Sequence, residues 1–225
     1  MPAKILTEPI EVDNRLEALG LSREQLLEVV EAVVGARADC TPNDPPGSQG
    51  WSAYRMGTRR LREVLLVDED WIKEEVDQIP CVTNAKLGIR IAVANTDDNT
   101  GIEDDDIKPQ NISKKGSATD RLVHSNQGSF MAILDASLNV VQLNKARKAP
   151  GPILFYYLCT YNEGDECRAE LSCPSAIVNG YFTDFVERII LVGPDDGGSG
   201  PARRKRRDDN DGGAPEFDVK VTRKK

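Results

Sequence analysis

The stretch PILFYYLCTYNEGDECRAELSCP, residues 152–174, constrains the fold of this chain more than any other segment. It consists of a long apolar run, a turn-prone segment at 162–165 that contains Gly164, and a second run. In the second run, apolar residues alternate with Arg168, Glu170 and Ser172, and a period of two is typical of a strand. The stretch therefore predicts a β-hairpin with one face buried.

Two more segments predict strands of the same sheet. Residues 87–95, LGIRIAVAN, carry apolar side chains at every second position from Leu87 onward. Residues 185–192 follow the turn-prone pair Asn179-Gly180. The sheet then has at least four strands and is mostly antiparallel. In the last strand, Glu187 and Arg188 would project to opposite faces, so one of these charges should face the core or a neighbouring element and need a partner.

Three segments predict helices. In LSREQLLEVVEAVVGAR, Ser22 and Gln25 have the spacing of a capping box, and apolar residues recur at helical spacing to about Ala36. The proline- and glycine-rich residues 40–50 predict a loop, after which residues 51–66 predict a second helix. The inner side of that helix carries Tyr54, Leu61 and Leu65.

A third helix is expected to begin at Ser117, where Ser117 and Asp120 form an N-cap arrangement. Residues 129–143 fit neither period cleanly, so helix and strand both stay open for them. Together the elements predict the α+β class, with N-terminal helices packed against the sheet.

The length of the chain, 225 residues with 39% hydrophobic content, suffices for one sizeable core. We expect a single α+β domain over residues 1–195. Residues 196–215 are rich in glycine and charge and predict a flexible linker. Residues 216–225 contain EFDVKV, which can return to the sheet as an edge strand, followed by a basic tail.

Composition and missing motifs make several protein classes improbable. The N-terminal residues lack the apolar segment of a secretory signal, and no later run approaches the length of a membrane span. We therefore expect a soluble, cytoplasmic protein without a membrane partner. The five cysteines show no metal-type or CxxC spacing and predict reduced thiols. With His124 as the only histidine, a multi-histidine metal site is excluded.

An acidic segment directly follows the strand at 87–95 and has three interpretations. It can be a solvated loop, a metal site or a contact for a basic partner. The calcium-loop pattern does not fit, because aligning its glycine to Gly101 places threonine at two ligand positions. Turn chemistry explains the asparagines and aspartates without a metal. The carboxylates of this segment belong to Asp97, Asp98, Glu103, Asp104, Asp105 and Asp106.

Three basic segments are candidates for contact with nucleic acid or another anion. Arg55, Arg59 and Arg62 share one face of the second helix and can contact successive phosphates, or be solvated or paired internally. Lys114 and Lys115 precede the start of the third helix, which suits an anion, although an ordinary capped loop has the same residues. The tail contributes Arg203, Arg204, Lys205, Arg206 and Arg207, directly followed by acidic residues.

A nuclease signature is a further hypothesis. It combines Asp195 with Asp218 and Lys220, the two carboxylates binding Mg²⁺ and the lysine stabilising charge. Asp97 and Asp98 are additional metal ligands under this hypothesis. A second acid-x-Lys triplet, at 106–108, shows that the spacing also arises by chance. No cofactor is predicted otherwise.

The leading functional hypothesis is a small intracellular accessory or interaction protein that works in a larger assembly with a protein partner, next to nucleic acid. It depends on the segregation of basic and acidic segments, which favours partner choice and orientation, and on a formal charge of -8, which argues against a coat for nucleic acid. A metal-dependent nuclease or other phosphate-ester enzyme is the alternative, so enzymatic activity stays open. A structural component of a phage-like assembly is the third hypothesis.

Overall fold

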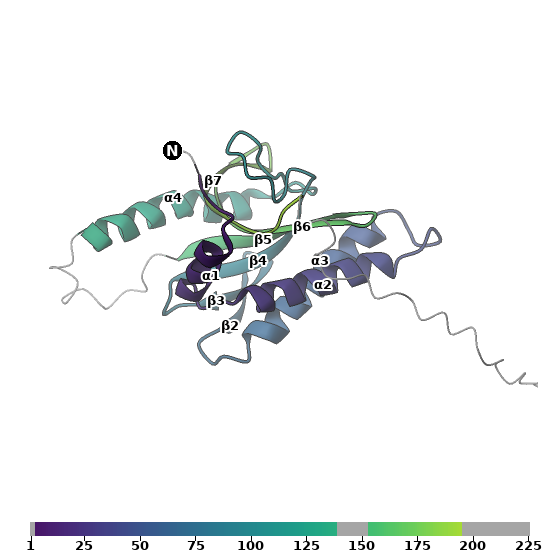
Figure 1. Ribbon diagram of the computed structural model, residues 1–225, viewed down its shortest axis with the longest axis horizontal. Coiled ribbons are helices and arrows are strands. Elements are labelled where there is room, and N and C mark those ends of the chain that lie inside the picture. Colours follow the sequence, from purple (N-terminus) through teal and green to yellow (C-terminus); the bar gives the residue numbers. More distant parts are fainter. Residues whose placement is uncertain (1–2, 139–152, 195–225) are drawn as a thin grey trace, which may run out of the picture.

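The computed structural model describes residues 3–138 and 153–194. These residues form four helices and seven strands (Figure 1). In chain order the elements are β1 (Lys4–Leu6), α1 (Pro9–Ala18), α2 (Arg23–Ala38), α3 (Ser48–Leu65), β2 (Ile72–Val76), β3 (Ile79–Asn84), β4 (Ile89–Asn95), α4 (Ser117–Leu138), β5 (Leu154–Glu163), β6 (Glu166–Val178) and β7 (Tyr181–Val192).

All seven strands belong to one sheet, in the order β1-β7-β6-β5-β4-β3-β2. Four of the six pairings are antiparallel. The β1–β7 and β4–β5 pairings are parallel; for β4 and β5 a crossover connection is required, and α4 lies in it. The chain is therefore an α+β protein with a mostly antiparallel sheet, as its sequence predicts.

The sheet lies between two helical layers (Figure 1). The helices α1, α2 and α3 pack on one face, where they share an apolar cluster with Ile91 and Val93 of β4. On the opposite face, Val123 of α4 joins a second cluster around Phe155 and Tyr157 of β5. Because both faces are covered, the centres of β5 and β6 are buried on both sides. The prediction of a hairpin with only one buried face is wrong.

Local signals at the start of α2 act as predicted. The Ser22 hydroxyl accepts a hydrogen bond from the Gln25 amide at 3.2 Å, and the Gln25 side chain accepts one from the Ser22 amide at 2.9 Å. This reciprocal capping box satisfies two amide groups that the first turn of a helix leaves unpaired. Its hydrophobic neighbours, Leu21 and Leu26, are both buried.

Gly57 allows α3 to approach α2 and the sheet closely. A Cβ atom at this position would lie 2.7 Å from Val33 Cγ2 and 3.1 Å from Val93 Cγ1. Contacts of this length force neighbouring atoms to move, and well-packed cores resist such movement. The packing of three elements therefore requires glycine here, although glycine lowers the helix propensity of α3.

Tight turns connect β5, β6 and β7. Gly164, in the connection between β5 and β6, has a φ of 59°. Between β6 and β7, Asn179 and Gly180 have φ angles of 55° and 88°, and two successive residues in this region form the turn that suits a two-residue hairpin. The predicted hairpin and the predicted following strand are confirmed, and β7 begins at Tyr181 rather than Phe185.

Several predicted boundaries differ from the structure. α3 begins at Ser48, inside the expected loop 40–50, after Gly47 with a φ of 85°. Leu87 lies in the turn before β4 and is half-exposed, so the strand starts at Ile89. These differences arise because glycines and prolines that predict a loop also occur next to helix and strand ends.

The α4 helix also differs from its prediction. Ser117 is already helical, and the amide of Asp120 donates to the Gly116 carbonyl at 3.2 Å, so Gly116 occupies the N-cap position. The open segment 129–143 is helical as far as Leu138, and residues 139–143 lie outside the described residues.

Four elements have no counterpart in the prediction: α1, β1, β2 and β3. The sequence of β2, IKEEV, is short and mostly charged, so its strand conformation depends on pairing with β3 rather than on its own pattern. The linker at 196–215, the edge strand at 216–221 and the domain boundary at 195 all concern residues beyond the described ranges, and stay predictions.

The five cysteines are free thiols, and Cys81, Cys159 and Cys173 are buried. Burial raises the pKa of the Cys167 thiol to about 11, which keeps this group protonated and unreactive at neutral pH. Within residues 3–138 and 153–194, no helix has both the length and the apolar character needed to cross a membrane.

Candidate functional site

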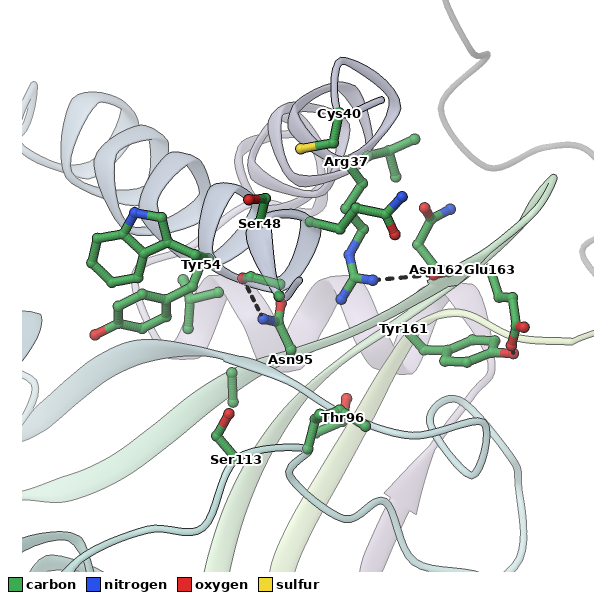
Figure 2. A pocket seen from close by; sticks show the side chains of 18 of the residues that line it. Arg37, Cys40, Ser48, Tyr54, Asn95, Thr96, Ser113, Tyr161, Asn162 and Glu163 are labelled. Atoms are coloured by element: carbon green, nitrogen blue, oxygen red, sulfur yellow. Dashed lines mark hydrogen bonds between the residues drawn. The ribbon is translucent and has the colours of Figure 1, made fainter. Parts of the chain in front are cut away.

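A large cleft opens at the carboxyl ends of β4 and β5 (Figure 2). Its volume is about 1770 Å³. One wall is formed by the end of α2, the loop after it and the first turns of α3, and the other by the loop that leads into α4. The turn between β5 and β6 closes one end.

The position of the cleft follows from the topology. β4 and β5 are parallel neighbours, with Asn95 opposite Thr160. The chain leaves β4 toward α4 on one face, while α3 covers the other face. Because β5 continues through a tight turn into β6, the space beyond the ends of β4 and β5 is bounded by the start of α3 on one side and by the loop leading into α4 on the other.

Asn95 lies at the floor of the cleft, at the last position of β4. Its Nδ2 donates to the Gly50 carbonyl at 2.8 Å, which connects the sheet to the first turn of α3. Its backbone carbonyl accepts from the Ile112 amide at 3.0 Å. Its Oδ1 is buried without a hydrogen-bond partner among the described residues. A ligand that donates a hydrogen bond would satisfy this acceptor.

Arg37 extends from the last turn of α2 toward the same space (Figure 2). Its Nη1 donates to the Asn162 carbonyl at 3.4 Å, and its Nε is buried without a partner among the described residues. Burial lowers the pKa of Arg37, and the nearby Cys167 and Cys40 thiols act weakly in the opposite direction. The guanidinium thus retains a donor that an anionic ligand can use.

Lys115 lies on the other wall, immediately before α4. Its Nζ lies 5.1 Å from the ring centroid of Tyr157 and 5.9 Å from that of Phe182. Burial lowers the pKa of Lys115, and only the Cys159 thiol partly offsets this effect. The aromatic faces stabilise the ammonium group less than a carboxylate would. An anion in the cleft would therefore interact favourably with this charge.

Aromatic side chains line the cleft beside these cations. Trp51, in the first turn of α3, is 64% exposed, and its ring centroid lies 6.0 Å from that of Tyr54. Burial raises the pKa of the Tyr54 hydroxyl, so Tyr54 is a neutral hydrogen-bonding group at physiological pH. An exposed tryptophan beside a cleft is a large apolar surface that a flat ligand can cover.

Carboxylates on the rim have local partners. Glu163 accepts from the Tyr161 hydroxyl at 3.0 Å, and Glu166 pairs with Arg168 at 2.5 Å. Asp44 accepts from the amide of Thr41 at 2.6 Å. These acidic groups lie at the tip of the β5–β6 hairpin and in the α2–α3 loop, and they line the same cleft as the cations.

The predicted arginines of α3 do not line this cleft. Arg59 pairs with Glu63 at 2.7 Å, and Arg62 donates to the Glu74 carbonyl at 3.3 Å. Arg55 is exposed. Of the predicted basic residues that the structure describes, only Lys114 and Lys115 lie at the cleft. The five basic residues at 203–207 lie outside the described residues.

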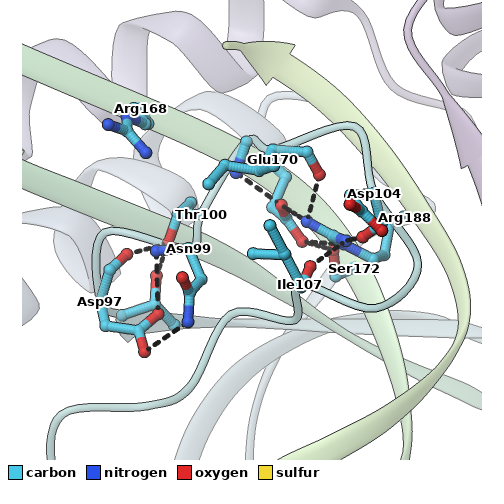
Figure 3. A network of polar contacts seen from close by, with 12 residues as sticks. Asp97, Asn99, Thr100, Asp104, Ile107, Arg168, Glu170, Ser172 and Arg188 are labelled. Carbon is cyan, nitrogen blue, oxygen red and sulfur yellow. Dashed lines mark hydrogen bonds and ion pairs between the residues drawn. The ribbon is translucent and has the colours of Figure 1, made fainter. Parts of the chain in front are cut away.

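The acidic loop between β4 and α4 is organised by hydrogen bonds (Figure 3). Asp97 Oδ1 accepts from the amides of Asn99 and Gln110, at 3.3 and 3.0 Å. Burial nevertheless raises the pKa of Asp97. The Thr100 hydroxyl donates to the Asp97 carbonyl at 2.6 Å. Turn chemistry thus accounts for Asp97, while Asp98 is exposed.

A buried ion pair holds this loop on the sheet. Arg188 of β7 and Glu170 of β6 are both 0% exposed and lie 2.8 Å apart. Arg188 also donates to three loop carbonyls, and Glu170 accepts from the loop amide of Gly101 at 2.8 Å (Figure 3). The three carbonyl acceptors belong to Ile102, Asp104 and Ile107.

The other charge of this strand is also buried and paired. Glu187 accepts two hydrogen bonds from Arg15 Nε, at 2.9 and 3.0 Å, and a third from the Tyr156 hydroxyl at 2.9 Å. Glu187 and Arg188 thus project to opposite faces, as predicted, but both faces bury a charge. The sequence predicts a buried charge on only one of these faces.

The described residues contain no group of three or more His, Cys, Asp or Glu side chains arranged to hold a metal ion. Asp195, Asp218 and Lys220 of the nuclease hypothesis lie beyond these residues, so the hypothesis stays a prediction. His124 is exposed on α4, and its Nε2 lies 3.3 Å from Asp120 Oδ1.

Most cleft residues carry no signal in the sequence. Arg37, Trp51, Asn95 and Tyr157 belong to four different elements and come together only in the folded chain. The one available signal is the position of Asn95 at the end of a predicted strand. Comparisons with protein-family models, with curated proteins and with solved structures find no match for this chain.

Proposed function

We propose that this chain is a small accessory protein of a larger assembly and that it binds single-stranded nucleic acid in the cleft at the ends of β4 and β5. The observation that carries the proposal is the combination, in one cleft, of two partly desolvated cations, Arg37 and Lys115, with the exposed ring of Trp51. Single-strand sites combine positive charge along the backbone with aromatic platforms for bases.

The cations support binding of phosphate. Arg37 retains an unpaired buried Nε, and Lys115 carries a charge against aromatic rings. Gly47, which precedes α3, and Gly116, which precedes α4, both line the cleft. Amide groups in the first turn of a helix carry partial positive charge, which favours anions nearby. Lys114 adds a third cation to the same wall.

The aromatic and amide groups support binding of bases. Every base has a flat face that can stack on tryptophan, so Trp51 suits a strand of mixed sequence. The unpaired Oδ1 of Asn95 can accept a hydrogen bond from an exocyclic amino group. The volume of about 1770 Å³ exceeds the roughly 300–1,000 Å³ of pockets for small molecules, which favours a polymer segment over one small ligand.

Substitution of Trp51 by alanine is the main test. We expect the affinity for a labelled single strand to fall about 5- to 150-fold, the equivalent of one lost stacking interaction. Arg37→Gln should weaken binding and lower the slope of log affinity against log salt by about 0.7 for a lost phosphate contact. The measurement is fluorescence anisotropy with single- and double-stranded DNA and RNA over a salt series.

Two controls separate the cleft from other basic surfaces. Arg59→Gln removes a charge of α3 outside the cleft and should leave affinity unchanged. A full-length variant with glutamine at positions 203–207 reports on the basic tail. Binding that depends on the tail or on Arg59, and not on Trp51 or Arg37, would contradict the proposal.

The affinity should also depend on pH through Lys115. Because burial lowers the pKa of Lys115 below the ordinary 10.5, this group loses its charge at lower pH than other lysines do. Binding of a single DNA strand is therefore expected to weaken as pH rises, at lower pH than for a contact made by an ordinary lysine. In Lys115→Met this pH dependence should be reduced, and an unchanged pH profile in that variant would exclude Lys115 as a contact.

A further inference from the structure

The strand β2 forms one edge of the sheet (Figure 1). Among the strands that the structure describes, its only neighbour is β3, to which it pairs over its whole length. Lys73 and Glu75 are exposed, and Ile72 is 51% exposed. An accessible edge of this kind presents backbone groups that can pair with another strand.

The backbone groups of Lys73 and Glu75 point toward the open edge. Glu75 lies opposite Pro80 of β3, and proline has no amide hydrogen to donate. Opposed residues of an antiparallel pair alternate between bonded and non-bonded pairs, so Glu75 and Lys73 belong to the non-bonded set. The Glu74 carbonyl accepts a hydrogen bond from Cys81 Sγ at 3.5 Å, which indicates that the backbone groups of Glu74 point toward β3.

The side chains of β2 are complementary to a second β2 in antiparallel orientation, and Glu75 stays 64% exposed beside its own Arg62, whose Nη2 lies 3.8 Å from Glu75 Oε1. If a two-fold axis passes beside Glu74, Lys73 of each copy lies opposite Glu75 of the other, and Ile72 lies opposite Val76. Lys73 and Glu75 would be bonded pairs in this register, as their outward backbone groups require. A shift that centres the axis on Lys73 or Glu75 instead places like charges opposite one another, which is unfavourable.

The residue on the axis does not oppose this arrangement. Glu74 would meet its own copy, but its carboxylate lies 2.7 Å from Arg90 Nη2 and 2.6 Å from the Thr83 hydroxyl. The hydrogen bond from Thr83 and the charge of Arg90 lower the pKa of Glu74. In each copy, Arg90 therefore pairs with the Glu74 carboxylate of the same chain. This pairing reduces the repulsion between the two Glu74 carboxylates across the axis.

From this complementarity we infer that two copies of the chain associate through β2, so that one sheet continues across both. The inference does not depend on the function proposed for the cleft, although the β2–β3 turn at Gln78 also lines that cleft. Lysines and other charges on an edge strand usually prevent association. In β2, Lys73 and Glu75 are two residues apart on the same strand. The same charges therefore favour pairing with a second copy in antiparallel orientation.

A charge exchange tests the inference. Sedimentation of the full-length chain, from micromolar to millimolar concentration, should show a reversible dimer. Lys73→Glu and Glu75→Lys, each alone, turn two attractive pairs into two repulsive ones and should each weaken the dimer about tenfold or more. The double variant K73E/E75K exchanges the charges and should restore most of the lost dimer affinity, although it replaces the partner of Arg62 by a second cation.

A backbone variant provides a second test. Glu75→Pro removes an outward amide while leaving the ladder between β2 and β3 in place, so it should abolish the dimer while its circular dichroism spectrum stays unchanged. Lys4→Glu, a change on the exposed residue of β1 at the opposite edge of the sheet, is the matched charge control and should leave the dimer intact. A monomer at all concentrations would overturn the inference, as would a dimer that neither single charge change affects.

Discussion

Arg188→Met is expected to lower the free energy of unfolding by about 3–5 kcal/mol, because it leaves Glu170 as a buried charge without its partner. Both side chains of the native pair are 0% exposed. The substitution also removes the donor from three loop carbonyls, those of Ile102, Asp104 and Ile107. Chemical denaturation followed by circular dichroism measures the loss.

A local measurement should accompany the global one. The amide of Gly101 donates to Glu170 Oε2 at 2.8 Å, so its hydrogen exchange reports whether the acidic loop stays on the sheet. We expect faster exchange of Gly101 in Arg188→Met. The double variant R188M/E170M should recover part of the lost stability, since no uncompensated charge is left, although the loop carbonyls still lack their donor.

The matched control is Arg59→Met, which removes an arginine from an exposed ion pair on α3. Exposed pairs contribute little to stability, so this variant should unfold at nearly the native denaturant concentration. If Arg188→Met is as stable as Arg59→Met, the buried pair is not what holds the loop, and our interpretation of the network is wrong.

Asn126→Leu is expected to lower the free energy of unfolding by about 2–4 kcal/mol, because it leaves buried backbone groups without hydrogen bonds. Asn126 is fully buried on α4. Its Nδ2 donates to the carbonyls of Phe155 and Pro174, at 2.9 and 2.7 Å, and its Oδ1 accepts from the Phe155 amide at 2.7 Å. Leucine is similar in size but offers none of these contacts.

The control for this variant is Asn14→Leu, an exposed asparagine on α1, for which we expect little change. Asn126 joins α4 to both β5 and β6, and the start of α4 carries one wall of the cleft. Asn126→Leu should therefore also weaken strand binding, although Asn126 does not line the cleft. Native stability in Asn126→Leu would contradict the assignment of these hydrogen bonds as the anchor of α4.

The two networks have a functional consequence for the proposed site. The Arg188–Glu170 pair holds the loop that follows β4, and Asn126 holds the helix that follows this loop. Lys114 and Lys115 lie between these two anchors. The Lys115 amide itself donates to the Gly180 carbonyl at 2.9 Å, so the two networks and this backbone contact together hold the lysines at the cleft.

Signals that act within a few residues correctly predict the local structure. The capping box of Ser22 and Gln25 and the turn at Asn179-Gly180 form as predicted, because their hydrogen bonds and φ angles involve only neighbouring residues. Local patterns do not predict β2, whose charged residues become a strand through pairing with β3. Local patterns also predict only one buried face for the β5–β6 hairpin.

The sequence by itself determined the α+β class, the main helices and hairpins, and the need of Glu187 or Arg188 for a buried partner. Only the tertiary structure decided which partners these are, Arg15 for Glu187 and Glu170 for Arg188. It also decided that Arg37, Trp51, Asn95 and Lys115 surround one cleft. The physical reason is that capping, turn geometry and periodicity act between near neighbours, whereas these contacts join residues far apart in the chain, which only the packing of helices on the sheet brings together.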